Sequence, residues 1–301
     1  ILGINLDYCI AYSRDSCSTN HDAVNRLMPL SINSLNMLCF PHTLHNAGKH
    51  LNLPVLDEFM TPWVQLVPKP GAAKLRWSSI LGKGVSSYSK VRWWSRWDIM
   101  QELALNFGAL PGFLADLERD DIGDATTKKM LDIITNQRHE LELELAAVMS
   151  CERLAKATYR LEGDRLELLL VYRTIEELRD YGKNLGKDAN DLPSVAAILR
   201  AKGDITINHE TREWFPAPHN KWYHGKVTRL PITTGAARNR ISTYKVTYDE
   251  DSTSIEQEEQ ELRNNMYVLK MPGWQKAVNA VKKAYDYIEE RITDDCQVPY
   301  H

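Results

Sequence analysis

The chain opens with Ile1-Leu2-Gly3-Ile4-Asn5-Leu6-Asp7-Tyr8-Cys9-Ile10-Ala11-Tyr12, and this stretch decides how its first part folds. It is rich in β-branched, aromatic and long apolar residues, which favour a buried strand. The polar residues Ser18, Thr19 and Asn20 follow and can cap a helix. A second such unit comes next, with a strand expected over 34–40 and a helix over 43–51. Alternating strands and helices predict an α/β arrangement, a parallel or mixed sheet covered by helices.

The bulk composition is that of a globular chain. With 301 residues, 43% hydrophobic and 26% charged, it can form two or three domains with ordinary cores. Five scattered cysteines predict no disulfide framework and fit a reducing compartment. No apolar run approaches the ~20 residues that span a bilayer, so we expect no membrane contact. The first residue is Ile rather than Met, which indicates a fragment, and the net charge of −3 supplies no global attraction for nucleic acid.

The middle of the chain has the periodicity of helices. From Gly71 to about Tyr181, apolar residues recur at three- and four-residue spacings, which predicts a helical bundle. Gly182, Gly186 and Pro193 mark a linker, and a short helix is expected near 195–201. After Gly203, several short strands separated by turn residues predict a small all-β barrel. An amphipathic helix beginning near Trp274 closes the chain.

Four short sequence motifs occur in an order that is typical of one protein family. They are Asp15-Ser16-Cys17-Ser18-Thr19-Asn20, Cys39-Phe40-Pro41-His42, Arg92-Trp93-Trp94-Ser95 and Ala157-Thr158-Tyr159-Arg160-Leu161-Glu162-Gly163-Asp164. In this order they resemble the middle of a hAT-type DNA transposase, over about residues 1–185. The resemblance implies a partial RNase H-like core over 1–70 and a helical insertion over 71–202. It also implies a nuclear protein with DNA as its partner.

The resemblance implies a role for Asp15. Transposases of this class use three carboxylates to hold two metal ions that activate water for strand transfer. Asp15, at the end of the first strand, matches the second carboxylate; the first is expected upstream of Ile1, and the third has no counterpart because the β-rich segment stands in its place. We therefore expect Mg²⁺ only if the parent transposase is active. An Asp followed by Ser and Thr also commonly forms a cap or a turn.

A dense basic and aromatic patch predicts DNA binding by Lys90, Arg92, Trp93 and Arg96. Arg and Lys attract phosphates, and indole rings can stack on bases. By resemblance, Trp93 stacks on a displaced base, although Tyr88 stands where the family has an Asp. The alternative is that Trp93 and Trp97, four residues apart, point into the bundle core.

Cys39 and His42 have a spacing that can serve zinc. A zinc site usually shows two such pairs, and no second Cys-containing pair accompanies this one. A packed Cys and a hydrogen-bonded His are therefore the favoured interpretation.

Residues 217–227 followed by 244–249 are similar to a Tudor-type barrel, here expected over 203–270, with a C-terminal helix over 271–301. The resemblance implies an aromatic cage that holds a methylated ammonium or guanidinium group by cation–π attraction. Its expected members are Trp222, Tyr223, Tyr248 and Asp251, with Trp214 or Phe215 as a further wall. Alternatively, about half of these aromatics fill the barrel, because Tyr244 and Tyr248 face one side of their strand.

Positive and negative charges are separated along the sequence of the β-rich segment. Residues 221–248 carry six Lys and Arg residues and no acid, whereas 249–261 are strongly acidic. A basic face suits a phosphate backbone, and an acidic turn suits a basic peptide such as a methylated histone tail.

These observations predict a transposon-derived protein associated with nucleic acid or chromatin, a catalytically incomplete fragment of a transposase joined to a Tudor-like reader. An oligomer is compatible with this prediction. Two alternatives stay open: part of an active metal-dependent DNA transposase, and a purely structural protein whose tryptophans form a core.

Overall fold

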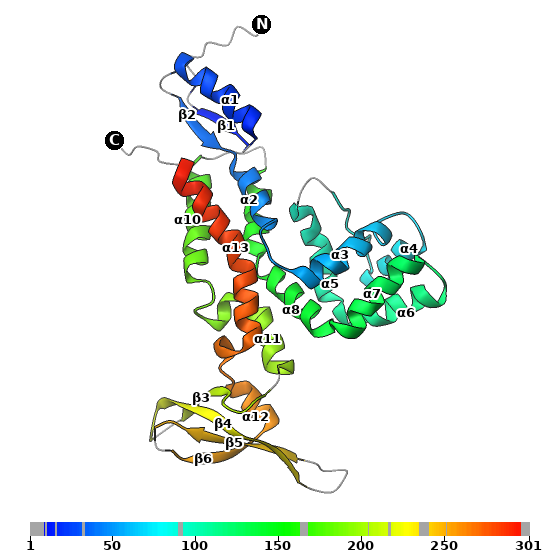
Figure 1. Cartoon of the computed structure of the whole chain (residues 1–301), viewed down its shortest axis with the longest axis vertical. Coiled ribbons are helices and arrows are strands. Elements are labelled where there is room, and N and C mark those ends of the chain that lie inside the picture. Colours follow the sequence, from blue (N-terminus) through cyan, green and yellow to red (C-terminus); the bar gives the residue numbers. More distant parts are fainter. Residues whose placement is uncertain are drawn as a thin grey trace. The chain divides into compact units, whose positions relative to one another are not determined.

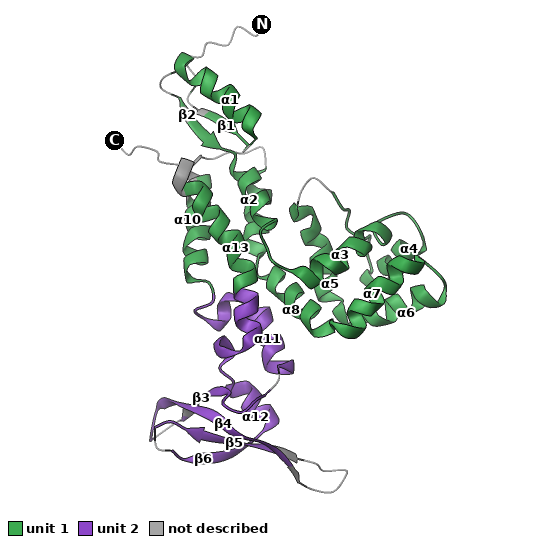
Figure 2. Ribbon diagram, in the orientation of Figure 1, with its two compact units in different colours: residues 1–185, 279–301 green, residues 186–278 purple. Residues whose placement is uncertain are grey.

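The computed structural model describes most of the chain and divides it into two compact units, described separately below (Figures 1 and 2). One unit contains residues 1–185 and 279–301, and the other contains 186–278. The described residues are 9, 11–15, 17–31, 34–89, 93–162, 168–203, 205–215, 218–234, 241–250 and 252–295. The chain is mixed α/β and mostly helical, which agrees with the fold class expected at the coarse level.

The first unit begins with two parallel strands joined by a helix. Strand β1 (Ala11–Arg14) pairs with β2 (Leu35–Leu38), and α1 (Ser18–Leu27) and the short η2 (Met28–Leu30) connect them. The N-terminal strand expected over 1–12 falls largely outside the described residues, since only positions 9, 11 and 12 of it are included.

Helix α2 (Phe40–Gly48) begins three residues before the expected position at 43. Pro41 stands in its first turn, where the fixed φ of proline suits a helix and the missing N–H group has no helical partner to lose. The proline therefore lies inside the start of the helix rather than before it.

A helical bundle makes up most of the first unit. The periodicity predicts its helices after Gly71, whereas helix α3, which begins at Pro54, was not predicted. Its described helices after α2 are α3 (Pro54–Leu66), α4 (Ala72–Leu81), η3 (Trp93–Arg96), α5 (Trp97–Leu105), η4 (Phe107–Ala109), α6 (Leu110–Arg119), α7 (Asp124–Asn136), α8 (Arg138–Met149), α9 (Glu152–Leu161) and α10 (Leu168–Asn184). Helix α3 packs against α7 and α8, and α2 packs against α9. Large aromatics fill the core, where the Trp63 and Trp77 rings meet edge to face with their centroids 5.1 Å apart.

The second unit contains an antiparallel sheet and several helices. Its elements are η5 (Ala189–Asp191), α11 (Pro193–Lys202), β3 (Glu210–Phe215), β4 (Lys221–Thr234), β5 (Ile241–Tyr248), β6 (Ser254–Glu258), α12 (Glu259–Asn265), η6 (Val268–Lys270) and the beginning of α13 (Pro272–Asp295), whose later residues belong to the first unit. The strand order is β3-β4-β5-β6. Among the described residues, the sheet is open, because β3 and β6 are its edges and are not paired with each other.

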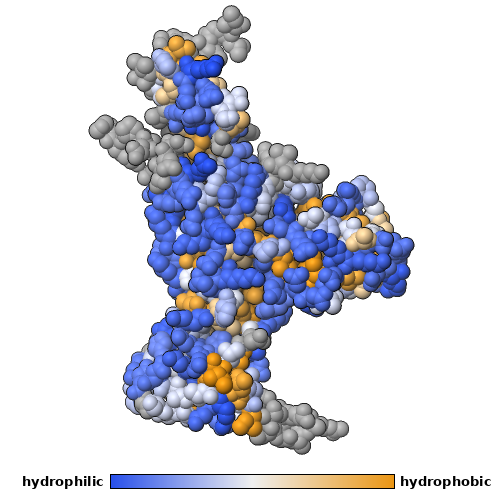
Figure 3. All heavy atoms as spheres, in the orientation of Figure 1, coloured by the Kyte–Doolittle hydropathy of each residue, from blue (hydrophilic) through white to orange (hydrophobic). Residues whose placement is uncertain are grey.

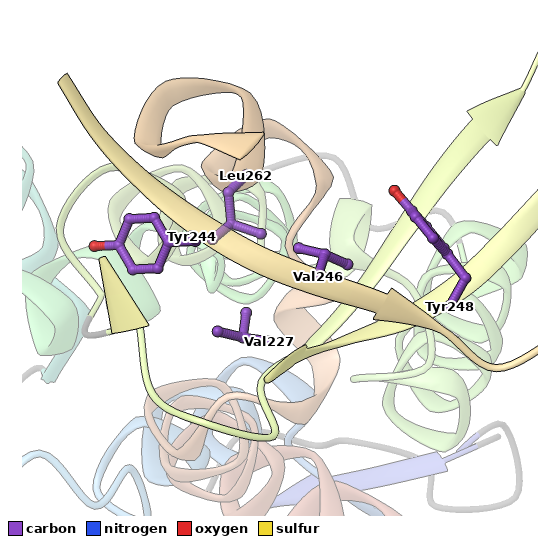
Figure 4. Close-up of a cluster of buried hydrophobic side chains, with 5 residues drawn as sticks. All are labelled: Val227, Tyr244, Val246, Tyr248 and Leu262. Atoms are coloured by element: carbon purple, nitrogen blue, oxygen red, sulfur yellow. The ribbon is translucent and has the colours of Figure 1, made fainter. Parts of the chain in front are cut away.

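One face of this sheet carries the core of the second unit. Val227 of β4 and Tyr244, Val246 and Tyr248 of β5 are buried together, and Leu262 of α12 packs over them (Figure 4). Residues two apart along β5 share this face, as the alternation of a strand requires. On the face of the molecule drawn in Figure 3, the surface is mostly hydrophilic with separate hydrophobic patches.

Candidate functional site

Asp15 and Cys39 follow the two parallel strands directly, at the carboxyl end of each. Because parallel strands present their carboxyl ends at one edge of a sheet, the two residues lie at the same edge. They line an open cavity of about 510 Å³, together with Ser13, Arg14, Asn20, Ala23, Val24 and His42. This cavity, called the Asp15 cleft below, brings together three residues that the sequence singles out: Asp15, Cys39 and His42.

The carboxylate of Asp15 is held by two hydrogen bonds. Its Oδ1 atom accepts one from the backbone N–H of Cys17 at 3.0 Å and one from the side-chain amide of Asn20 at 2.8 Å. The Cys17 bond and then the Asn20 bond hold the pKa of Asp15 below its usual value, with smaller contributions from the charges of His42 and Arg14. The bond to Cys17, two residues on, is also the turn geometry that the sequence left open.

The Asp15 cleft does not by itself fit a two-metal site. Asp15 is the only carboxylate among its described lining residues, and Mg²⁺ prefers several oxygen ligands. Within the described ranges, no group of three or more His, Cys, Asp or Glu side chains lies close enough together to hold a metal ion. Cys39 and His42 lie near each other without completing such a group.

Trp93 and Trp94, in the Arg92–Ser95 motif, contact helix α2, which begins in the Cys39–His42 motif. The backbone N–H of Trp93 donates to the imidazole ring of His45 in α2, and Trp94 Nε1 donates to the carbonyl of Leu44 at 2.8 Å. A Cβ atom added at Gly48 would overlap the Trp93 ring, so the indole packs directly on the α2 backbone. The sequence reasoning missed His45, Leu44 and Gly48 because their partners lie far along the chain.

A further hydrogen bond joins helix α9 to Trp94. The hydroxyl of Tyr159 donates to the carbonyl of Trp94 at 2.8 Å. Trp94 and Trp97 are buried, with exposed fractions of 1% and 5%, which confirms the core interpretation for Trp97. Trp93 is half-buried.

The basic members of the predicted DNA-binding set have different positions. Arg96 forms an ion pair with Asp57 at 3.2 Å, and its side chain is only 18% exposed. Burial raises the pKa of Asp57, and the charge of Arg96 opposes this shift. Arg96 therefore contributes mainly an ion pair within the helical bundle. Lys90 and Arg92 lie outside the described residues.

In the second unit, three aromatic rings meet at one end of the buried face of the sheet. The centroids of Phe215 and Tyr223 are 4.9 Å apart, those of Phe215 and Tyr248 5.5 Å, and those of Tyr223 and Tyr248 6.2 Å, all edge to face. We call Phe215, Tyr223 and Tyr248 the aromatic corner. The Tyr223 hydroxyl also lies 3.0 Å from His219 Nδ1.

A carboxylate lies beneath the aromatic corner. The Tyr248 hydroxyl donates to Glu213, and the Gln257 side-chain amide donates to the same Glu213 oxygen at 2.6 Å. Burial first, and then the Glu213 carboxylate, raise the pKa of Tyr248 well above its usual value, so its hydroxyl stays protonated. Tyr248 is buried, so its ring lies at the bottom of the aromatic corner and is not exposed at its side.

The predicted cage is assembled only in part. Tyr223 and Tyr248 come together, but Trp222 precedes Tyr223 on β4 and points to the opposite face, where the Arg212 guanidinium carbon lies 4.5 Å from the centroid of its ring. Asp251 lies outside the described residues, and the side chain of Trp214 is not described. The ammonium of Lys221 lies 4.5 Å from the centroid of the Tyr223 ring. Glu213 and Gln257 were missed, because the register of β3 on β4 was needed to place Glu213 and that of β6 on β5 to place Gln257.

Comparison of the chain with protein-family models, with curated proteins and with solved structures gives no match. Among the described residues, no helix is both long enough and apolar enough to cross a membrane.

Proposed function

We propose that the chain is a transposon-derived, nucleic-acid-binding protein of hAT-type ancestry, with a partial RNase H-like core and a helical insertion. One observation carries the proposal: the Arg92–Ser95 motif contacts helix α2, which begins in the Cys39–His42 motif, and it also contacts the Ala157–Asp164 motif. Trp93 bonds to His45, Trp94 bonds to Leu44, and Tyr159 bonds to Trp94. Asp15 and Cys39 at one edge of parallel strands give further support, because ligands of α/β sheets bind at that edge.

The chemistry of the segment before η3 suits DNA. In the sequence, Lys90 and Arg92 come three residues and one residue before Trp93, whose side chain is half-buried. Cationic side chains bind phosphates by releasing condensed counterions, and an indole face can stack on an unpaired base. The segment therefore combines the two contributions that a DNA end with a displaced base requires.

DNA binding can be tested by fluorescence anisotropy with a labelled duplex over a range of salt concentrations. Replacing Lys90→Gln and Arg92→Gln together should weaken binding and lower the slope of log K against log salt by about 2, since each phosphate contact contributes about 0.9. The matched control replaces Lys128→Gln and Lys129→Gln, two exposed lysines of α7 in the same unit. Equal losses in the two double variants would contradict the proposal.

The alternative is that the chain is part of an active metal-dependent DNA transposase. A cleavage assay with Mg²⁺ on a duplex substrate separates the two, because a binding protein leaves the duplex intact. Mg²⁺-dependent cleavage that is lost in Asp15→Ala would favour the active enzyme. In that case the further carboxylates come from outside the described lining of the Asp15 cleft.

The aromatic corner favours a second role, Tudor-like binding of a methylated lysine or arginine in a histone or another basic peptide. The observation behind it is that a cation already lies over the Tyr223 ring, namely the ammonium of Lys221 at 4.5 Å. Calorimetric titration with trimethyl-lysine and unmodified histone peptides tests this role. We expect tighter binding of the methylated peptide and its loss in Tyr223→Leu; equal binding of both peptides would contradict it. Either role predicts a nuclear protein.

A further inference from the structure

The sheet of the second unit has two edge strands, and they differ in what covers them. On β3, the carbonyl of Glu210 accepts a hydrogen bond from the N–H of Tyr267 at 3.0 Å, and Thr211 forms an isolated bridge with Met266. Among the residues that the structure describes, β6 pairs with β5 alone and is the outermost strand of the sheet (Figure 1). Four of its five residues are exposed. Strand β6 is therefore an open edge, on which another strand can pair.

The hydrogen bonds to β5 show which backbone groups of β6 point outward. The N–H of Tyr248 donates to the carbonyl of Thr253 at 2.9 Å. In an antiparallel pair, residues that bond to the partner alternate with residues whose backbone groups point away from it. Ile255 and Gln257, two and four positions after Thr253, therefore bond to β5. The residues of β6 that turn their backbone N–H groups to the open edge are Ser254, Glu256 and Glu258.

The side chains of β6 differ in chemistry between the two faces of the sheet. Ile255 is on the core face, because it lies opposite the buried Val246, and its side chain is 38% exposed at the edge of that face. On the other face, Glu256 accepts a hydrogen bond from Arg229 at 2.6 Å. Glu258 forms no ion pair with a described residue. A strand added at this edge therefore meets an apolar side chain on one face and carboxylates on the other.

The segment that contains β6 has a surplus of negative charge. Its described residues between 249 and 261 include six carboxylates and neither Lys nor Arg. Two of them, Glu256 and Glu259, form ion pairs with arginines, and Lys245 of β5 lies opposite Glu256. The carboxylates that have no ion pair with a described residue are Asp249, Glu250, Glu258 and Glu261. This surplus favours a basic strand over a second copy of β6, because pairing β6 with itself would bring like charges together.

We propose that β6 binds a basic, extended peptide as a fifth strand of the sheet. The peptide pairs antiparallel to β6, as the four strands of this sheet do with one another. Its basic side chains lie on the face of Glu256 and Glu258, and its apolar side chains cover Ile255. The site uses backbone hydrogen bonds and charge, so it requires neither a methylated side chain in the aromatic corner nor DNA binding by the first unit.

The probe is a fluorescein-labelled peptide of about ten residues in which lysine and valine alternate, and anisotropy measures its binding to the full chain. N-methylation of its lysines should weaken binding at least about tenfold, because an antiparallel strand turns the N–H groups of the residues opposite Glu256 and Glu258 toward β6. N-methylation of its valines should change the affinity by less than about threefold, because their N–H groups point away from β6. A peptide with glutamate in place of lysine should bind at least about tenfold more weakly than the probe.

Two variants of β6 test the protein side of the contact. Ser254→Pro removes an outward N–H at the first position of the strand and should weaken binding about three- to tenfold. Ser254→Ala, which keeps the N–H and loses only the hydroxyl, is its control and should bind like the wild type. Glu258→Gln should weaken binding about two- to fivefold. Its control is Glu210→Gln, the same change at the opposite edge of the sheet, which should stay within about twofold of the wild type.

Equal affinities of the two N-methylated peptides would overturn the proposal, because they would indicate attraction by charge without strand pairing. Failure of the wild-type chain to bind the lysine–valine peptide would do so too. Tyr223→Leu should leave the binding of this probe unchanged; a loss there would assign the peptide to the aromatic corner and contradict the β6 site. Thermal unfolding of each variant shows whether a loss of binding reflects a loss of folding.

Discussion

The backbone N–H of Trp93 lies 2.8 Å from Nδ1 of His45, and this bond joins residues 48 positions apart. The same backbone nitrogen lies 3.0 Å from Nε2, so the Trp93 N–H faces the imidazole ring between its two nitrogens. The side chain is buried, and its helix α2 also receives the Trp94 indole at Leu44. His45 therefore positions the start of η3 on α2.

Replacing His45→Ala should destabilise the first unit by about 1–3 kcal/mol, because the Trp93 N–H loses its acceptor and a buried ring leaves a void. It should also weaken DNA binding, since Trp93 loses its hydrogen bond to α2. Thermal unfolding and the duplex anisotropy assay measure the two effects. His21→Ala, at an exposed position of α1, is the control and should change neither. A stable His45→Ala with unchanged DNA binding would show that the contact is dispensable.

The close approach of Trp93 to Gly48 predicts opposite effects of the same substitution in two helices. Gly48→Ala should destabilise the chain by about 1–3 kcal/mol, because the added methyl group overlaps the indole in a packed region. Gly112→Ala in α6 meets no atom within 4 Å and should stabilise by about 0.5–1 kcal/mol through helix propensity. Chemical denaturation of both variants measures the difference. If both are stabilised, Trp93 does not pack on α2.

Local pattern predicted many of the elements, but not helices α3 and α12, and it did not predict the contacts between elements. The apolar spacing between 71 and 181 predicts helices that the structure contains, and the carboxyl-end position of Asp15 follows from the strand before it. Trp222 and Tyr223 were grouped in one cage on family resemblance, although adjacent residues of a strand face opposite sides. Placing Glu213 under Tyr248 needs the register of β3, β4 and β5, and that register depends on contacts between distant segments that a local pattern does not encode.

A bidentate ion pair in the first unit predicts a pH dependence. Arg179 donates through Nε and Nη2 to both carboxylate oxygens of Glu289, with a distance of 2.8 Å for the second. The Arg179 bonds lower the pKa of Glu289 from its usual 4.5, and burial opposes this shift. A carboxyl whose pKa is lower in the folded state stabilises the fold above its unfolded pKa, and this contribution is lost as the pH falls through the folded value.

Glu289→Gln should therefore lower the free energy of unfolding by about 1 kcal/mol at pH 7, a modest value because the pair is partly exposed. The difference from the wild type should shrink as the pH falls below 4.5. Urea unfolding at several pH values measures it, with Glu140→Gln at an exposed position of α8 as the control. A difference that grows on acidification would contradict the sign of this linkage.

The Lys221 ammonium over Tyr223 competes with any cationic ligand for the same ring face, so a peptide that binds the aromatic corner must displace it. Lys221→Met removes the charge while keeping an unbranched chain, and it should tighten binding of a trimethyl-lysine peptide two- to fivefold, since a cation–π contact at an exposed site contributes about 0.5–1 kcal/mol. Lys226→Met removes the same charge from the opposite face of the sheet and serves as the control in the calorimetric titration. Weaker binding in Lys221→Met than in Lys226→Met would mean that Lys221 assists the ligand, and the aromatic corner would then bind an anionic or neutral group rather than a methylated cation.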